Sequence, residues 1–261
     1  MLHQITPLIL TFNEAPNIGR TLERLSWARD AVVVDSFSSD DTLAIVSRYA
    51  NARVFQRKFD DHARQWNFGL KETAIGTDWV LALDADYIVT DEFLREVQAL
   101  APEADVAGYR VRFRYCIEGQ PLRAAVYTPV TVLYRLACAE YVQDGHTQRV
   151  RLAGRILDLR NPIFHDDRKP LRHWLHSQSR YMELEADHLC RLRFSELAIQ
   201  DQVRKLIVIA PVAMFFYCML VKANVLDGRA GFFYALQRTV AESILSLYLL
   251  RALLAPVGNE E

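Results

Sequence analysis

Apolar runs alternate with amphipathic helical patterns through the first 86 residues, and this alternation constrains the fold more than any other feature. The expected strands are residues 5–11, 31–34, 53–57 and 79–83, and the expected helices are 16–28, 40–50 and 62–73. Ala31-Val32-Val33-Val34 is an unbroken apolar run, typical of a strand buried on both faces. Repeated strand–helix units of this length predict a right-handed, doubly wound α/β fold with a mostly parallel sheet.

The pattern changes after residue 90. Residues 90–100 predict a helix, and residues 106–159 predict short strands that are antiparallel and extend the sheet. From residue 171 the chain is expected to be helical, with two unusually apolar segments at 206–221 and 244–254. We therefore predict a catalytic domain over 1–170 and a helical region over 171–261.

Bulk composition excludes several classes of protein. Hydrophobic residues make up 51% of the 261 residues and charged residues 24%, which is typical of a globular chain. The formal net charge of −1 gives no overall attraction to nucleic acid, so no nucleic-acid partner is expected. The four cysteines contain no C-x-x-C pair, which favours reduced thiols. The first residues do not resemble a signal peptide, so a cytoplasmic location is predicted.

Polar residues follow the first two expected strands. Ligands of open parallel sheets bind beyond the carboxyl ends of the strands, so these residues are candidates for ligand contact. The candidates are Thr11, Asn13, Glu14, Asp35, Ser38 and Asp40. The alternative is that the same residues only cap the helices that follow them.

Two further places carry candidate site residues. Arg64 and Asn67 lie on the third expected helix, where Arg64 is suited to steady a phosphate or to orient an acidic loop, or is simply exposed. Asp84 and Asp86 end the fourth expected strand, and alternation along an extended segment sends both to the same side. Two hard oxygen ligands favour Mg²⁺ or Mn²⁺, which bridges a diphosphate.

In this order the four elements resemble family 2 of the inverting glycosyltransferases. That family has T-x-N-E, V-V-D-S-x-S-x-D-x-T, R-x-x-N-x-G-L and L-D-A-D segments, which match residues 11–14, 33–42, 64–70 and 83–86 here. The resemblance implies a GT-A, Rossmann-like fold and a UDP-type donor, with the nucleoside near Thr11, Glu14 and Asp35. It implies that Asp84 and Asp86 lie near the diphosphate and metal. Where family members often carry an acid after L-D-A-D, this chain has Tyr87.

The resemblance also implies later site residues. The catalytic base of an inverting transferase deprotonates the acceptor hydroxyl, and Asp144 is the candidate, with Glu140 as the alternative. Lipopolysaccharide-core-type relatives often show His-Glu where this chain has His146-Thr147. His165 is the candidate for a further metal ligand. Arg168 and Lys169 either contact phosphate or begin a solvated helix.

The C-terminal region suggests a membrane surface. An Arg-rich helical pattern with Trp174 and Tyr181 precedes the two apolar segments, and these are too short or interrupted for comfortable crossings. Residues 224–232 resemble the L-D-G-x-x-G-F segment of the lipopolysaccharide-core-like group. A peripheral protein at the inner face of the cell membrane is expected, with a glycan or lipid-linked acceptor.

The expected activity is metal-dependent, inverting transfer of a glucose-like or N-acetylglucosamine-like sugar from UDP. Three alternatives remain open from sequence: a polyprenyl-phosphate glycosyltransferase, a nucleotidyltransferase, and a non-catalytic sugar-nucleotide-binding or scaffold protein. The nucleotidyltransferase usually has a glycine-rich loop with a basic residue after the first strand, which residues 11–14 lack. Donor sugar, acceptor, linkage and oligomeric state are left undetermined.

Overall fold

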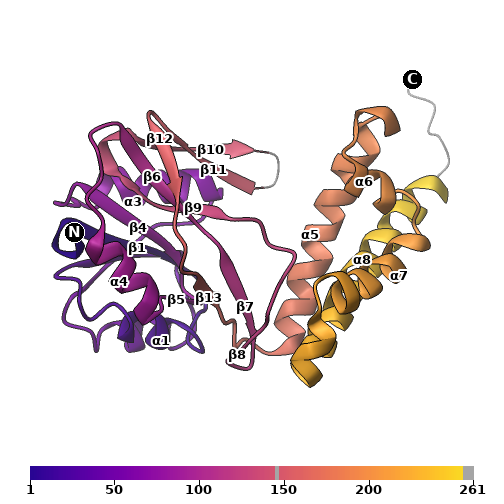
Figure 1. Ribbon diagram of the computed structural model, residues 1–261, viewed down its shortest axis with the longest axis horizontal. Coiled ribbons are helices and arrows are strands. Elements are labelled where there is room, and N and C mark those ends of the chain that lie inside the picture. The colour runs from indigo at the N-terminus through magenta and orange to yellow at the C-terminus, as the bar shows by residue number, and fades with distance from the viewer. Residues whose placement is uncertain (145–146, 255–261) are drawn as a thin grey trace. The chain divides into compact units, whose positions relative to one another are not determined.

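The structure is a computed structural model that describes residues 1–144 and 147–254, apart from the side chains of Asp144 and Thr147 (Figure 1). The chain divides into two compact units. The first comprises Met1–Pro121 and Tyr127–Lys169, and the second comprises Leu122–Val126 and Pro170–Glu261.

A seven-stranded sheet forms the centre of the first unit (Figure 1). Its order is β12 (Arg155–Asp158), β6 (Val106–Val111), β9 (Val130–Arg135), β4 (Trp79–Asp84), β1 (Ile5–Thr11), β2 (Ala31–Asp35) and β3 (Ala52–Gln56). Only β9 runs antiparallel to its neighbours in this sheet. The predicted fold class, a mostly parallel Rossmann-like sheet flanked by helices, is confirmed.

Helices cover both faces of this sheet because its strands β1, β2 and β4 are apolar on both faces. Leu8, Val32 and Val34 pack with Trp66 and Leu70 of α3 (His62–Glu72). The opposite face packs against α1 (Ile18–Glu23), α2 (Thr42–Val46) and α4 (Asp91–Ala99). α1 and α2 are shorter than the sequence predicts.

The strand registers bring three polar chain segments to one edge of the sheet. Thr11 lies opposite Asp35 in the β1–β2 pair, and Leu10 lies opposite Asp84 in the β1–β4 pair. The carboxyl ends of β1, β2 and β4 are therefore level, and the loops that follow them are neighbours.

The strands after residue 106 only partly form the antiparallel extension that the sequence predicts. β12 joins the large sheet parallel to β6, and β9 is inserted antiparallel between β6 and β4. β10 (Ala139–Asp144) and β11 (Thr147–Leu152) form a hairpin. β13 (Ile163–His165), β7 (Phe113–Ile117) and β8 (Gln120–Pro121) form a small sheet with the earlier strand β5 (Tyr87–Ile88). Periodicity alone does not assign partners to such short strands.

The second unit is helical. It contains α5 (Leu171–Arg191), α6 (Ile199–Arg204), α7 (Ile209–Phe216), a π-helical turn at Tyr217–Val221, a 3₁₀ turn at Asn224–Asp227, and α8 (Gly228–Leu254). α8 packs against both α5 and α7, and Met182, Leu189 and Leu245 lie in its core. Arg204 pairs with Glu185 and with the buried Glu242. The predicted segment 244–254 is the end of α8, not a separate helix.

Local backbone chemistry sets the helix boundaries in this unit. Ile207 and Ala223 adopt positive φ values of 51° and 55°, which end the helical runs before them. Pro211 lies in the first turn of α7, where its missing N–H leaves no helical bond unmade. At Gly231 a Cβ would lie 1.9 Å from the carbonyl oxygen of Asn224, so only glycine fits there.

In the described residues, no single helix combines the length and apolar composition required to cross a membrane. One pair, Ile209–Val221 with Asn224–Leu254, meets these criteria jointly and is bent by 72°.

Candidate nucleotide-sugar site

The loops after β1 and β2 are tied together by their predicted site residues. Asn13, in the left-handed region with φ 53°, donates its backbone N–H to Ser38 Oγ (2.8 Å) and accepts the Ser39 N–H at Oδ1 (2.8 Å). Asp40 accepts the backbone N–H groups of Ala15 and Thr42. The structure thus brings Asn13, Ser38 and Asp40 together, and their bonds join the two loops to each other. The N-cap residues of α1 and α2 are Asn17 and Asp41, and neither makes a side-chain capping bond.

Asp35 lies at the end of β2 and is fully buried. Its carboxylate accepts the Ser38 N–H and the Gln56 side-chain amide, each at 3.0 Å. Thr11 ends the neighbouring β1, and its hydroxyl is buried with no hydrogen-bond partner among the described residues. Both residues stand at the expected sheet edge, where they shape the floor of the loops.

Glu14 forms a buried ion pair with Lys169. Lys169 Nζ lies 2.5 Å from Glu14 Oε1, and Asn17 donates to Glu14 Oε2 at 2.7 Å. Burial raises the pKa of Glu14 to about 7, against the attraction of Lys169 and with the repulsion of Asp86. The sequence left open whether Lys169 contacts a phosphate or begins a solvated helix. In the structure Lys169 is paired with Glu14.

Asp84 is the last residue of β4, and Asp86 lies two residues later. The two carboxylates have different surroundings. The side chain of Asp84 reaches solvent at its edge. Protein nevertheless surrounds the carboxyl closely enough that desolvation, together with the charge of Asp86, raises its pKa to about 6. The Tyr87 hydroxyl hydrogen bonds to the Asp84 carboxylate, a contact that the sequence did not predict. Asp86 is buried, and its Oδ1 has no hydrogen-bond partner in the described part of the chain.

His165 reaches the aspartate pair from β13. Its Nε2 lies 3.1 Å from Asp86 Oδ2, although 79 residues separate the two in sequence. Burial opposes the charged imidazole, but Asp86 attracts it, and the pKa of His165 is raised overall. The same pairing offsets the burial of Asp86 and lowers the pKa of that carboxyl.

Aromatic rings enclose the imidazole. Tyr87, Tyr115 and Tyr127 each meet it edge to face, with ring centroids 5.0–5.5 Å away. Tyr115 and Tyr127 are stacked on each other at 5.6 Å, and Tyr127 is exposed. An exposed aromatic face therefore stands beside the aspartate pair.

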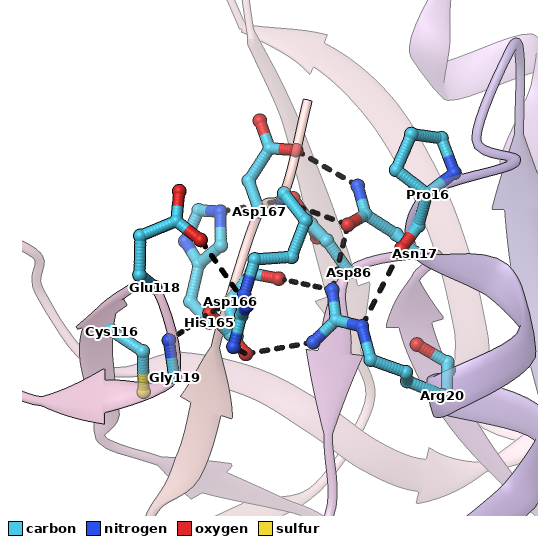
Figure 2. Close-up of polar contacts among 12 residues, drawn as sticks. Pro16, Asn17, Arg20, Asp86, Cys116, Glu118, Gly119, His165, Asp166 and Asp167 are labelled. Atoms are coloured by element: carbon cyan, nitrogen blue, oxygen red, sulfur yellow. Dashed lines mark hydrogen bonds and ion pairs between the residues drawn. The ribbon is translucent and has the colours of Figure 1, made fainter. Parts of the chain in front are cut away.

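The segment after His165 is fixed to the start of α1 (Figure 2). Arg20 donates to the side chain and the backbone carbonyl of Asp166, at 2.7 and 2.8 Å, and Asn17 Nδ2 donates to Asp167 at 2.8 Å. Arg168 pairs with Asp166 and Glu118 rather than lying free. Pattern-based reasoning missed Asn17 and Arg20, and the only signal for the network was the dense charge of residues 165–169.

Arg64 and Asn67 lie one turn apart on α3 but have different surroundings. Asn67 bonds the backbone of Tyr141 through both amide atoms, accepting its N–H at 2.9 Å and donating to its carbonyl at 2.8 Å. Arg64 is exposed and pairs with Asp60 and Asp61 on the same helix end. Together with Arg57 and Lys71, Arg64 lines an open groove of about 270 Å³.

The two candidate bases lie on β10. The side chain of Asp144 lies outside the described residues, so its surroundings are not described. Glu140 is exposed and forms a pair with Lys71 at 3.6 Å.

The predicted metal ligands are Asp84, Asp86 and His165. Across residues 1–144 and 147–254, no three His, Cys, Asp or Glu side chains form a group that could hold an ion together. Of the three, His165 and Asp86 contact each other, and Asp84 lies two residues before Asp86.

A sequence comparison identifies the family. The profile of Glycosyl transferase family 2 matches residues 8–149, which is more than half of the chain and includes the end of β1, all of β2 and β4, and the loops that follow them. The chain belongs to glycosyltransferase family 2. The predicted family is therefore confirmed.

Individual members of the family are similar over part of the chain. The lipopolysaccharide core biosynthesis glycosyltransferase LpsC of Rhizobium meliloti (strain 1021) is 31% identical over 137 residues, 50% of this chain and 48% of LpsC. An uncharacterized glycosyltransferase of Rickettsia felis is 26% identical over 179 residues, 63% of this chain and 62% of that protein. The match thus covers about half of LpsC and less than two thirds of the Rickettsia felis protein.

Solved structures show distant likeness. S. aureus TarS 1-349 in complex with UDP-GlcNAc gives a TM-score of 0.48 at 14% identity, covering 95% of this chain and 92% of that one. Glucosyl-3-phosphoglycerate synthase from Mycobacterium tuberculosis, in complex with Mn²⁺, UDP and phosphoglyceric acid, gives 0.37 at 20% identity, with 43% and 44% covered.

Proposed function

We propose that this chain is a glycosyltransferase that moves a sugar from a nucleotide donor, UDP-linked, to a glycan or lipid-linked acceptor. Membership of family 2 supports the reaction class. The observation that carries the proposal is the aspartate pair, Asp84 and Asp86, at the end of β4 and level with the loops after β1 and β2. Ligands of open sheets of this kind bind at that edge.

The residues at this edge fit a divalent cation. Asp86 Oδ1 is a buried carboxylate oxygen without a partner in the described residues, and buried polar groups of this kind commonly bind a water molecule or an ion. The pKa of Asp84 is raised to about 6, with burial and the charge of Asp86 as the main causes. A bound cation would therefore relieve the repulsion between the two carboxylates. Asp84 and Asp86 would hold Mg²⁺ or Mn²⁺, with His165 oriented against Asp86. The bound ion would neutralise charge on the donor diphosphate.

The chain's own groups have separable tasks in this proposal. Asp35 and the loops joined by Asn13, Ser38 and Asp40 would form a rigid floor for the nucleoside, because their hydrogen bonds are already made before a ligand arrives. Arg64 would attract the diphosphate from the open groove that it lines with Arg57, Lys71 and Glu72.

For the acceptor, the exposed ring of Tyr127 offers an apolar face to a sugar ring close to His165 and Asp86. Asp144 is proposed to take the proton of the acceptor hydroxyl as that oxygen attacks the anomeric carbon from the side opposite UDP, which inverts the configuration. The new bond joins the acceptor oxygen to the sugar, and the bond that breaks joins the sugar to the diphosphate.

A panel of nucleotide sugars tests the proposal directly. Release of free nucleotide is measured for UDP-, GDP-, dTDP- and CMP-linked sugars, with and without Mn²⁺, in the presence of candidate acceptors. Metal-dependent release from a UDP-sugar is the expected result. UDP binding without turnover under any condition would instead indicate a sugar-nucleotide-binding protein, and turnover only with polyprenyl phosphate would indicate the phosphate acceptor.

A further inference from the structure

Helix α7 and the turn after it present apolar side chains to solvent. Val208, Leu220 and Val221 have exposed fractions of 78%, 66% and 71%. The spacing of residues 209, 212 and 216 puts three further exposed apolar side chains on one face of the helix. The opposite face, with Ala210 and Cys218, is the buried one.

Helix α8 also carries an exposed apolar face. Its members are Phe232, Leu236, Val240, Leu247, Leu250 and Leu254, and all are exposed. The ring of Phe215 contacts both Phe216 and Phe232, at 5.6 and 6.0 Å between centroids, and this joins the α7 side chains to the beginning of α8. We call the exposed apolar side chains of residues 208–221, together with these six of α8, the apolar surface. Contiguous exposed apolar surface of this kind is rare on soluble monomers and marks an interaction site.

The segment that carries the apolar surface exposes charges of one sign. Residues 206–254 contain two acids and four bases. Both acids are buried in ion pairs, Asp227 with Arg123 and Glu242 with Arg204. The bases Lys222, Arg229, Arg238 and Arg251 are partly or fully exposed. Lys222 extends over the ring of Tyr217 at 5.4 Å, a cation beside an aromatic ring of the kind found at membrane interfaces.

We propose that the apolar surface docks on an anionic lipid leaflet, with the helices lying in its plane. Basic residues around apolar side chains match a negatively charged lipid surface, and the burial of Asp227 and Glu242 leaves residues 206–254 without an exposed acid that such a surface would repel. α7 is eight residues long, about 12 Å, whereas a hydrocarbon core is about 30 Å thick. The 72° bend between the α7 segment and the α8 segment suits a path along the surface.

This lipid-docking surface would deepen the proposed function by favouring an acceptor that is itself anchored in the leaflet. Vesicle binding needs no donor and no transfer, however, so the two proposals can fail separately.

Vesicle flotation of the full chain tests the proposal. The protein is mixed with vesicles of phosphatidylcholine alone, or of phosphatidylcholine and phosphatidylglycerol in equal parts. Binding to the anionic vesicles is expected, and it should weaken with added salt. The variant Val212→Glu/Leu220→Glu should bind at least roughly tenfold less, because two exposed side chains would no longer enter lipid. Lys222→Glu/Arg229→Glu should lose the preference for anionic vesicles.

A matched control separates this surface from general stickiness. Ile156 is an exposed apolar residue of the first unit, and Ile156→Glu should leave binding unchanged. Circular dichroism of each variant checks that the helices persist. Equal loss in Ile156→Glu, equal binding to neutral vesicles, or a monodisperse dimer that ignores vesicles and dissociates in Val212→Glu/Leu220→Glu would overturn the proposal. Protein that stays in the membrane pellet after carbonate extraction would overturn the in-plane arrangement.

Discussion

The imidazole of His165 and the carboxylate of Asp86 lie 3.1 Å apart, between Nε2 and Oδ2. The contact joins β13 to the end of β4 and leaves the second carboxylate oxygen of Asp86 without a partner in the described residues. Each group favours the charged form of the other, so the pair holds Asp86 ionised in a buried position. An ionised, partly unsatisfied aspartate beside the exposed Asp84 is the arrangement on which cation binding would depend.

Loss of one aspartate should remove the metal dependence of donor binding. Asp84→Asn keeps the shape of an accessible side chain but removes a hard anionic ligand, so Mn²⁺ should no longer strengthen UDP binding. Asp86→Ala should do the same while the fold persists. Calorimetric titration of UDP with and without Mn²⁺ measures the effect.

Asp158→Asn is the control for that experiment, because Asp158 is an exposed acid that pairs with Arg110 far from the aspartates in sequence. It should behave like the parent. Mn²⁺ that strengthens UDP binding to Asp84→Asn and Asp86→Ala as much as to the parent would remove both residues from the metal site.

Glu14 should make the folded protein less stable as the pH rises. Its folded pKa of about 7 exceeds the ordinary value of 4.5, so between these values the folded chain holds a proton that the unfolded chain has lost. This contribution is complete below about pH 4.5 and disappears as the pH passes about 7. Glu14→Gln should remove a fall of at most about 3 kcal/mol between pH 5 and 7.5.

The measurement is the free energy of unfolding in urea at both pH values, compared between parent and variant. The comparison matters because Asp84, with its pKa raised to about 6, contributes a fall of the same sign in both proteins. Glu118→Gln, which alters an exposed acid, should keep the parental slope. Identical slopes in the parent and Glu14→Gln would mean that Glu14 is ionised throughout.

Asn67 should matter for stability more than for the donor. Asn67→Ala leaves the backbone N–H and carbonyl of Tyr141 without their side-chain partners, and should cost about 2 kcal/mol in the free energy of unfolding. Arg64→Ala is the matched contrast one turn away. It breaks only exposed ion pairs, so stability should stay within about 1 kcal/mol while UDP binding weakens. Weaker UDP binding by Asn67→Ala with little change in stability would instead indicate that Asn67 contacts the nucleotide.

Local pattern was sufficient for the framework of the site. β1, β2 and β4 are apolar runs followed by polar residues, and the registers place their ends level as a parallel sheet requires. Asp84 and Asp86 could be found in sequence because they end a buried strand. Their unlike surroundings could not, since Tyr87 and His165 contact them from neighbouring and distant segments.

Contacts between distant segments account for what the sequence did not reveal. Asn17 and Asp167 are 150 residues apart, and Lys169 reaches Glu14 across 155. A charged run such as residues 165–169 has the same composition whether it is solvated or internally paired, so only the fold distinguishes the two. The two short apolar segments were likewise ambiguous, because the backbone turns at Ile207, Ala223 and Gly228 decide where helices begin and end.

The identity of the base is the last prediction. Asp144→Asn should bind UDP like the parent but transfer sugar about 10²–10⁴ times more slowly, because the amide cannot accept the proton of the acceptor hydroxyl. Glu140→Gln tests the alternative on the same strand. Glu140 is exposed and paired with Lys71, so its loss should leave the rate nearly unchanged. Initial rates at saturating donor, with UDP affinity measured in parallel, separate chemistry from binding. Parental transfer by Asp144→Asn together with a slow Glu140→Gln would move the base to Glu140, and parental transfer by both would exclude this hairpin as its source.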